Sequence, residues 1–296
     1  MTTKPIDDLF SKNLPVEVQT VLDKLSGAIE ETVNFGTHVF NWCTNSGVHG
    51  IEHAPVFLSF RHILELLDSI SILVKSSSIE PSFLLLRAVF ESSLNIEYLL
   101  QGNLKIRGRD FLFWHQQDRL KLLKRIQNDK RSKLPYTTIL VSNEKKLEED
   151  IEFLEKVLDH PKFTDSKKEY VQYKNPSNWF NLHNGPRNIE ELADKLGKKD
   201  RYIILYKQWS KLVHGIDIFK GKYSKAKDGG TYFTQLRLPQ NCEKVTSFSI
   251  SFALEIYQIM VRNYAKKNIR CLAEWYKHEI KDLYVALSEH DLIKVI

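Results

Sequence analysis

Cysteine is scarce in this chain of 296 residues. The three cysteines, Cys43, Cys242 and Cys271, lie far apart and form no C-x-x-C pair. Their spacing argues against a zinc ribbon and against a disulfide framework, and it suits a reducing cytosol. The first residues, M-T-T-K-P-I-D-D, contain no apolar signal core, so we expect a cytoplasmic protein.

Long apolar runs are missing as well. A membrane-spanning helix needs about 18 or more residues with few or no charges, and no run in this chain reaches that length. The nearest candidate, around Phe83, is interrupted by Arg87 and Glu91. We therefore expect that the chain has no membrane-spanning segment.

Several motifs that carry chemistry are also absent. The chain has no phosphate-binding glycine loop, no G-x-S-x-G turn and no E-x-x-H pair of a di-iron bundle. The order H-x-x-E-H does occur from His49 to His53, as in inverzincin peptidases. Because Gly47, Gly50 and Pro55 mark a turn there, we interpret the match as a coincidence and expect neither a metal nor a cofactor.

What the chain does contain is apolar residues at helical spacing, with almost no alternation of period two. We predict an all-α fold, a multi-helix bundle with long first and last helices. A single domain is expected over residues 1–296, with core helices within 16–101 and 188–288. A protruding helical hairpin is expected as an insertion at about 105–160.

The expected elements follow from apolar periodicity and from the positions of glycine and proline. Thr164–Pro186 is expected to be a loop, and Thr231–Leu238 a short strand or extended loop. Helices are expected over Val16–Asn45, where Gly36 could cause a break, and over Val56–Ser78, Pro81–Gln101, Arg109–Lys130, Asn143–Leu158, Ile189–Leu196, Arg201–His214 and Thr246 to about Ser288, the last with room for a kink.

The helix Pro81–Gln101 is apolar almost all round, as a central buried helix is. Arg87 and Glu91 lie within it, four residues apart and therefore on one face. An ion pair in an apolar helix costs desolvation energy unless further partners complete its hydrogen bonds. We therefore expect that another part of the chain supplies those partners.

A second polar face lies on the helix predicted at Arg201–His214. Tyr206, Ser210 and His214 occur at i, i+4 and i+8, so they share one side of that helix. We predict that this face packs on Arg87 and Glu91, with Glu91 accepting a proton from His214 or from the Tyr206 hydroxyl. The alternative is a buried polar network that fixes helix packing without any reaction.

Basic residues are concentrated in the predicted hairpin. The formal charge is +6, and the segment from Lys105 to Lys133 holds ten Lys or Arg against three Asp. Such a face suits an acidic partner such as RNA, although a charge run is usually a solvated surface. The RNA-binding candidates are Arg119, Lys121, Lys124 and Arg125, together with Lys207.

The segments R-A-V-F-E and Y-K-Q-W-S-K-L-V-H-G resemble an uncharacterised bacterial family of all-helical proteins, a domain of unknown function. The resemblance extends over roughly Phe57 to Val285. That family is distantly similar to HEPN proteins, which are helical bundles, usually dimeric, many of them metal-independent ribonucleases of toxin–antitoxin and phage-defence systems. The fixed points of the resemblance are Arg87, Glu91, Tyr206, Ser210 and His214.

The HEPN signature is an Arg and a His with four to six residues between them. Arg109 and His115 match it, and Lys207 and His214 have the right separation but carry Lys in place of Arg. A guanidinium clamps a phosphate at two points, which an ammonium cannot do. A histidine near its ordinary pKa could transfer the protons of RNA cleavage, and a neighbouring cation, Arg87, Arg109 or Lys207, could stabilise the phosphorane.

Three functions remain open on these grounds. The first is a HEPN-like RNA-binding protein or metal-independent endoribonuclease, a toxin or antiphage effector acting as a homodimer. The second is a non-catalytic helical interaction or scaffold protein whose polar residues only lock the core. The third and weakest is a metal-dependent hydrolase that uses His49 and His53.

Overall fold

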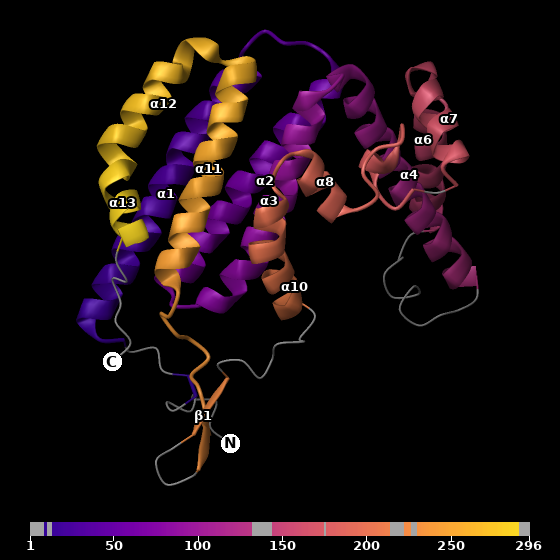
Figure 1. Ribbon diagram of the computed structural model, residues 1–296. Helices are drawn as coiled ribbons and strands as arrows, with labels where there is room; N and C mark the ends of the chain where they lie inside the picture. The colour runs from indigo at the N-terminus through magenta and orange to yellow at the C-terminus, as the bar shows by residue number, and fades with distance from the viewer. Residues whose placement is uncertain are drawn as a thin grey trace. The chain divides into compact units, whose positions relative to one another are not determined.

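The computed structural model describes residues 9–10, 14–131, 144–174, 176–213, 222–225 and 230–289. The described chain is almost entirely helical, so the predicted all-α class is confirmed (Figure 1). Its residues form two compact units. The first unit comprises Met1–Val48, Phe57–Glu97 and Gly197–Ile296, and the second comprises His49–Val56 and Tyr98–Leu196. A single domain with an inserted hairpin stays a prediction.

The first unit is a helical bundle with one small β-hairpin (Figure 1). The hairpin is antiparallel and pairs Tyr223 with Phe233, so the strand predicted from Thr231 is three residues long. The elements of this unit are α1 (Val16–Thr44), α2 (Ala54–Lys75, entering from the second unit), α3 (Ile79–Gln101, which continues into the second unit), α9 (Lys199–Arg201), a π-helical turn (Tyr202–Tyr206), α10 (Lys207–Val213), β1 (Tyr223–Lys225), β2 (Thr231–Phe233), α11 (Cys242–Tyr264), a 3-10 turn (Lys266–Asn268), α12 (Ile269–Trp275), a second π-helical turn (Tyr276–Ile280) and α13 (Lys281–Glu289).

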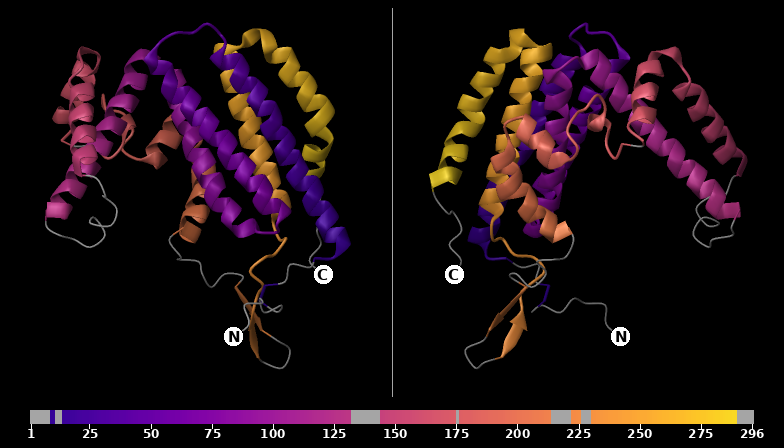
Figure 2. Two further views of the ribbon diagram at one scale, coloured as in Figure 1. Left: turned by 180° about the vertical axis from the view of Figure 1, so that it is seen from behind. Right: turned by 45° about the vertical axis from the view of Figure 1, so that its right-hand side comes forward.

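Helix α1 runs beside α11, as both views of Figure 2 show. The break that Gly36 could have caused is absent, since α1 is continuous through it. This glycine instead permits close packing: a Cβ at position 36 would lie 2.3 Å from the Tyr257 hydroxyl oxygen and 2.5 Å from Leu64. The fully buried Tyr257 donates a hydrogen bond to the Thr32 carbonyl, at 2.7 Å.

The long last helix predicted from Thr246 to about Ser288 is wrong. Helix α11 ends at Tyr264, and Ala265 adopts φ −140° and ψ 44°, outside the helical region. The chain then turns back, and α12 and α13 pack against α11. Neither glycine nor proline marks this turn, so the apolar period runs through it unbroken.

The second unit is built around α4 (Leu104–Arg131), against which two further helices and three 3-10 turns of the unit pack. Helix α4 begins five residues before the predicted Arg109 and continues through Gly108. A Cβ at position 108 would lie 2.3 Å from the Glu52 carbonyl oxygen, so only glycine allows this approach. The other elements are the 3-10 turns Ile51–His53, Pro161–Phe163 and Trp179–Asn181 and the helices α6 (Glu144–Leu158), α7 (Thr164–Gln172) and α8 (Ile189–Lys195).

Helix α7 corrects the loop predicted over Thr164–Pro186. Its two buried residues, Ser166 and Tyr170, are four apart and form a narrow face, while the rest of the helix is polar. The predicted start of α8 is confirmed, because the Asn188 side chain accepts a hydrogen bond from the Glu191 amide at 2.9 Å. The core of the unit joins α4, α6 and α7 through Phe113, Leu120, Leu147, Ile151, Leu154, Leu158, Phe163, Tyr170 and Leu182.

Both units are thus formed by helices with apolar faces. None of the helices in the described part of the chain combines the length and the apolar character that a membrane span requires. The predicted absence of a membrane-spanning helix holds for those residues.

Candidate functional site

Arg87 and Glu91 of α3 meet Tyr206, as the spacing of the polar residues predicted. The Arg87 Nε donates to Glu91 Oε1 at 3.0 Å, and its Nη2 donates to the Tyr206 hydroxyl oxygen at 2.7 Å. The Tyr206 hydroxyl in turn donates to Glu91 Oε1 at 2.8 Å. The three side chains therefore form a closed triangle of hydrogen bonds, in which Tyr206 is more than a hundred positions away from the other two residues.

Ser210 completes what we call the Arg87 cluster: Arg87, Glu91, Tyr206 and Ser210. The Arg87 Nη1 donates to Ser210 Oγ at 3.4 Å, and the guanidinium carbon lies 4.5 Å from the centre of the Tyr206 ring. Tyr206 is the last residue of the π-helical turn that leads into α10. A π-helical turn is rare and often accompanies a functional site, because it shifts the side chains that follow it around the helix.

The electrostatics of the cluster keep Arg87 charged and Tyr206 protonated at neutral pH. Burial, together with the hydrogen bond to Glu91 and its negative charge, raises the pKa of Tyr206 to about 12, against the opposing effect of Arg87. Burial alone would lower the pKa of Arg87, but Tyr206 and Glu91 raise it overall. The Arg87 and Glu91 side chains keep 21% and 35% of their surface exposed, so the cluster can be reached from solvent.

Two further candidates lie near this part of the sequence. Lys207 follows Tyr206 directly, is exposed, and holds its ammonium 5.5 Å from the Tyr202 ring centre. His214, which was predicted to join the cluster, lies outside the described residues.

With this geometry in view, the chain can be compared with known proteins. A family model described as a family of unknown function (DUF5677) matches residues 53–230, more than half of the chain. The chain belongs to this family. No curated protein and no solved structure matches it.

The DUF5677 match includes both halves of the Arg87 cluster, on α3 and around α10. It confirms the predicted resemblance to an uncharacterised helical family. The match is shorter than the predicted span to Val285, since it ends at residue 230 and leaves out α11, α12 and α13.

The alternative pair, Arg109 and His115, lies in the second unit on one continuous helix, α4. Side chains six residues apart on a helix point about 120° apart, so the pair does not converge on one phosphate. The Arg109 Nε is buried without a hydrogen-bond partner among the described atoms. The ring of His115 lies 4.2 Å from that of Phe111, and this desolvation lowers the pKa of His115 against the opposing charge of Asp118, although the residue keeps an exposed edge.

The predicted basic face of α4 is partly neutralised. Lys124 pairs with Glu155 at 2.6 Å, Arg125 approaches Asp129 at 3.9 Å, and the Lys121 ammonium lies 5.1 Å from the Tyr170 ring centre. Arg119 is exposed. The count of basic residues therefore overstates the charge that this face can offer to RNA.

The H-x-x-E-H match does not form a zinc site. Residues Ile51–His53 form a single 3-10 turn after Gly50, whose φ is 136°, so His49 and His53 are not one α-helical turn apart on the same face. Among the described residues, no group of three or more His, Cys, Asp and Glu side chains is placed to hold a metal ion.

Sequence reasoning missed a buried charge network in the first unit. The Lys198 side chain is 9% exposed, and its ammonium lies 2.5 Å from a Glu97 carboxylate oxygen and 2.8 Å from one of Glu255. Glu255 also pairs with Arg201 at 2.6 Å. Burial alone would raise the pKa of Glu255, but Lys198 and Arg201 lower it overall. Lys198 and Arg201 are three residues apart, but Glu97 and Glu255 lie in distant segments, so no local signal could have joined the cations to the carboxylates.

A second missed network lies in the second unit. Buried Asp110 accepts a hydrogen bond from Ser166 at 2.6 Å and pairs with His183 at 3.1 Å, while the other ring nitrogen of His183 lies 3.6 Å from Glu169. Because both ring nitrogens face carboxylates, the imidazole has no nitrogen left to activate Ser166. In a serine nucleophile site the serine bonds to the histidine, whereas here Ser166 bonds to the carboxylate. We therefore assign a packing role to this network.

Proposed function

We propose that this DUF5677 protein binds RNA and cleaves it without a metal ion, as HEPN-like ribonucleases do, with the Arg87 cluster as its reactive centre. The observation that carries the proposal is the partly exposed pairing of a guanidinium with a carboxylate and a tyrosine hydroxyl. Structural ion pairs are common, but a partly exposed ion pair on a largely apolar helix, with a tyrosine hydroxyl bonded to both charges, is an unusual arrangement.

The chemistry would use each group for what its charge allows. Glu91 would accept the proton of a ribose 2′-hydroxyl, whose oxygen then attacks the adjacent phosphorus. Arg87 would stabilise the negative charge that builds on the phosphorane oxygens. The bond to the 5′ oxygen would break as that oxygen receives a proton, leaving a 2′,3′-cyclic phosphate; His214 is the proposed donor.

The test is incubation of the purified protein with total RNA and with tRNA in EDTA, the wild type beside His214→Ala and His115→Ala. Cleavage that resists EDTA and is lost in His214→Ala, with thermal unfolding unchanged, supports the proposal and assigns the acid. Loss in His115→Ala alone would move the chemistry to the second unit. No cleavage by the wild type would contradict the proposal.

From the HEPN resemblance we further propose that the protein is a cytoplasmic homodimer, acting as a growth-arrest toxin or antiphage effector with a protein partner. Light scattering on the purified chain tests the dimer, and growth after induced expression tests the toxic effect. A monomer at micromolar concentration would contradict the first, and unchanged growth the second.

A non-catalytic interaction or scaffold protein is the second candidate, and one observation favours it. All three guanidinium nitrogens of Arg87 already donate to side chains, and the charges of Arg87 and Glu91 cancel. In that case Glu91→Gln would lower the melting temperature markedly while RNA remained intact with every variant. If Glu91→Gln lost cleavage while its melting temperature stayed unchanged, the scaffold role would be excluded.

A further inference from the structure

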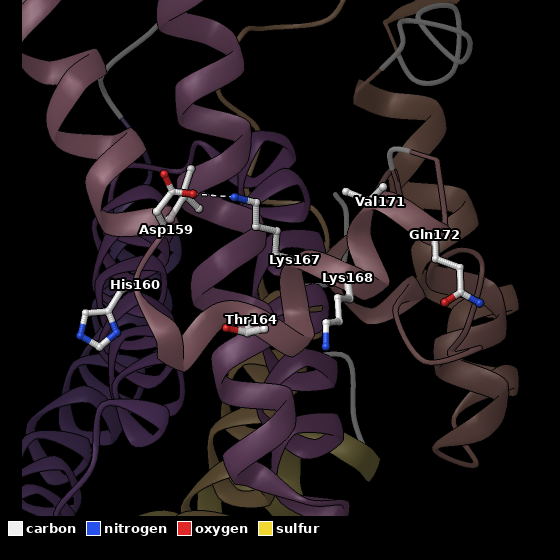
Figure 3. A pocket seen from close by; sticks show the side chains of 8 residues that line it. Asp159, His160, Thr164, Lys167, Lys168, Val171 and Gln172 are labelled. Atoms are coloured by element: carbon white, nitrogen blue, oxygen red, sulfur yellow. Dashed lines mark hydrogen bonds and ion pairs between the residues drawn. The ribbon is translucent and has the colours of Figure 1, made fainter.

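A groove in the second unit lies where α6 ends and α7 begins, with a cavity volume of about 540 Å³. Its walls come from the turn after Leu158 and from one side of α7. Figure 3 shows Lys167 directed toward Asp159, with Thr164, Lys168 and Gln172 along α7. The remaining residues that line it are Leu158, His160 and Val171.

Helical spacing explains why these side chains share the groove. Thr164, Lys167, Lys168 and Val171 lie at i, i+3, i+4 and i+7 of α7, so they form one exposed face of that helix. Two adjacent lysines lie at the middle of this face, and Figure 3 shows that Lys167 reaches toward Asp159 while Lys168 extends to the other side. The opposite face, with Ser166 and Tyr170, is buried in the core.

The charge balance of the groove is positive. Lys167 is paired with Asp159 at 2.5 Å, while no carboxylate among the described residues lies within 4 Å of the Lys168 ammonium. Two cations against one anion leave a net charge of about +1. This differs from α4, where Lys124 already has a carboxylate partner at 2.6 Å.

His160 adds a hydrogen-bond donor. Its Nδ1 accepts a hydrogen bond from the Lys162 amide at 3.2 Å, so in the neutral ring the proton resides on Nε2. The Nε2–H is then left to donate to an acceptor at the edge of the groove, where Figure 3 shows the ring directed away from Lys167 and Lys168.

An apolar wall completes the groove. Val171 is 68% exposed beside Lys167 and Lys168, although valine usually lies inside a protein. A phosphate ester matches both parts of this surface. Its oxygens can accept hydrogen bonds from the ammonium groups and the imidazole, and its sugar or base can cover the valine. A bare inorganic anion would leave the valine exposed.

We infer that this groove binds phosphate groups of a phosphate ester, through Lys168 and, at separate places along the groove, Lys167 and His160. If the protein is a ribonuclease, the phosphate ester is the RNA backbone, and this choice of ligand rests on the proposed function. A free nucleotide carries the same chemistry, and the test separates the two.

The test measures fluorescence anisotropy of a labelled 2′-O-methyl RNA, which cannot be cleaved through its 2′ position. One phosphate contact on a single strand contributes about 0.7 to the slope of log K against log salt, or about fivefold in affinity at 0.1 M relative to 1 M salt. We expect Lys168→Ala to weaken binding about fivefold at 0.1 M salt and to reduce the slope by about 0.7. Asp159→Asn should strengthen binding, because it releases Lys167 from its partner.

The matched control is Lys145→Ala, an equal change of charge on the same unit. Lys145 lies on α6, fourteen positions before Asp159 and therefore about 20 Å from the groove along the helix. Equal effects of Lys168→Ala and Lys145→Ala would overturn the inference, as would unchanged binding in Asp159→Asn. Displacement of the RNA by AMP would identify a free nucleotide as a ligand, and failure of AMP to compete would assign the groove to the polymer.

The groove and the ribonuclease proposal can fail separately. RNA binding that depends on Lys168, without cleavage by the wild type, would keep the groove and reject the Arg87 chemistry. Cleavage that is lost in Glu91→Gln, with Lys168→Ala and Lys145→Ala alike in affinity, would do the reverse.

Discussion

Removal of one oxygen atom tests the geometry of the Arg87 cluster. Tyr206→Phe keeps the ring, and with it the packing against Phe90 at a ring-centre distance of 6.1 Å, but deletes the hydroxyl. That hydroxyl accepts from Arg87 at 2.7 Å and donates to Glu91 at 2.8 Å. The substitution therefore breaks two charge-assisted hydrogen bonds and changes little else.

The magnitude follows from burial. A hydrogen bond to a charged group contributes about 1.5–3 kcal/mol to stability when water cannot replace it. The Arg87 and Glu91 side chains are 21% and 35% exposed, so water will replace part of the hydrogen bonding that the hydroxyl provided. We expect a loss of about 1–2 kcal/mol in the free energy of unfolding.

The assay is urea unfolding followed by circular dichroism, arranged as a double-mutant cycle with Glu91→Gln. Residues in direct contact show a coupling energy of about 0.5–3 kcal/mol, whereas distant residues add to within about 0.5 kcal/mol. Tyr232→Phe, on a residue that is 55% exposed in the same unit, is the control and should change stability by less than about 0.5 kcal/mol. A coupling energy indistinguishable from zero between positions 206 and 91 would refute the triangle.

Other consequences concern packing and charge. Gly36→Ala should destabilise the protein by about 1–2 kcal/mol in urea unfolding, because the new Cβ would meet the Tyr257 hydroxyl at 2.3 Å. In the same helix, the new Cβ of Gly27→Ala would meet nothing within 4 Å, so this substitution should stabilise the protein by up to about 1 kcal/mol. If both substitutions changed the stability in the same direction, the packing at Gly36 would be contradicted. The lowered pKa of Glu255 adds stability that is full above the ordinary carboxyl pKa and fades as pH falls through the lower folded-state value. Melting temperature should therefore depend less on pH in this acidic range for Glu255→Gln than for the wild type, and parallel curves would contradict this. Lys198→Ala should destabilise by about 3 kcal/mol or more, because two partly buried carboxylates lose their common cation, and a change below about 1 kcal/mol would contradict the network.

Helical periodicity allowed the fold class and the meeting of α3 with α10 to be predicted. Arg87 and Glu91 were conspicuous because charge is rare on an apolar helix, and Tyr206 and Ser210 because they repeat at one helical face. Both signals are visible within one helix. The ion pair required hydrogen-bonding partners, and the polar face of Tyr206 and Ser210 could supply them. The inference was that these two distant segments pack together.

What could not be predicted depends on contacts between distant residues. The end of α11 at Tyr264 has no glycine or proline, and the chain reverses there only because α12 and α13 find an apolar surface on α11. Helix α7 looked like a loop because its buried face is only two residues wide. Lys198 and its two partners, Glu97 and Glu255, come from three separate segments, so no spacing in the sequence connects them.

The most direct measurement of the central claim is the rate of RNA cleavage in EDTA for Glu91→Gln beside Glu65→Gln. Both glutamates pair with an arginine four residues earlier, but the Arg61–Glu65 pair on α2 is exposed and has no tyrosine in place of Tyr206 among its described partners. We predict that Glu91→Gln abolishes cleavage while Glu65→Gln cleaves as the wild type does. Equal rates for the two variants would contradict the assignment of the Arg87 cluster as a reactive centre.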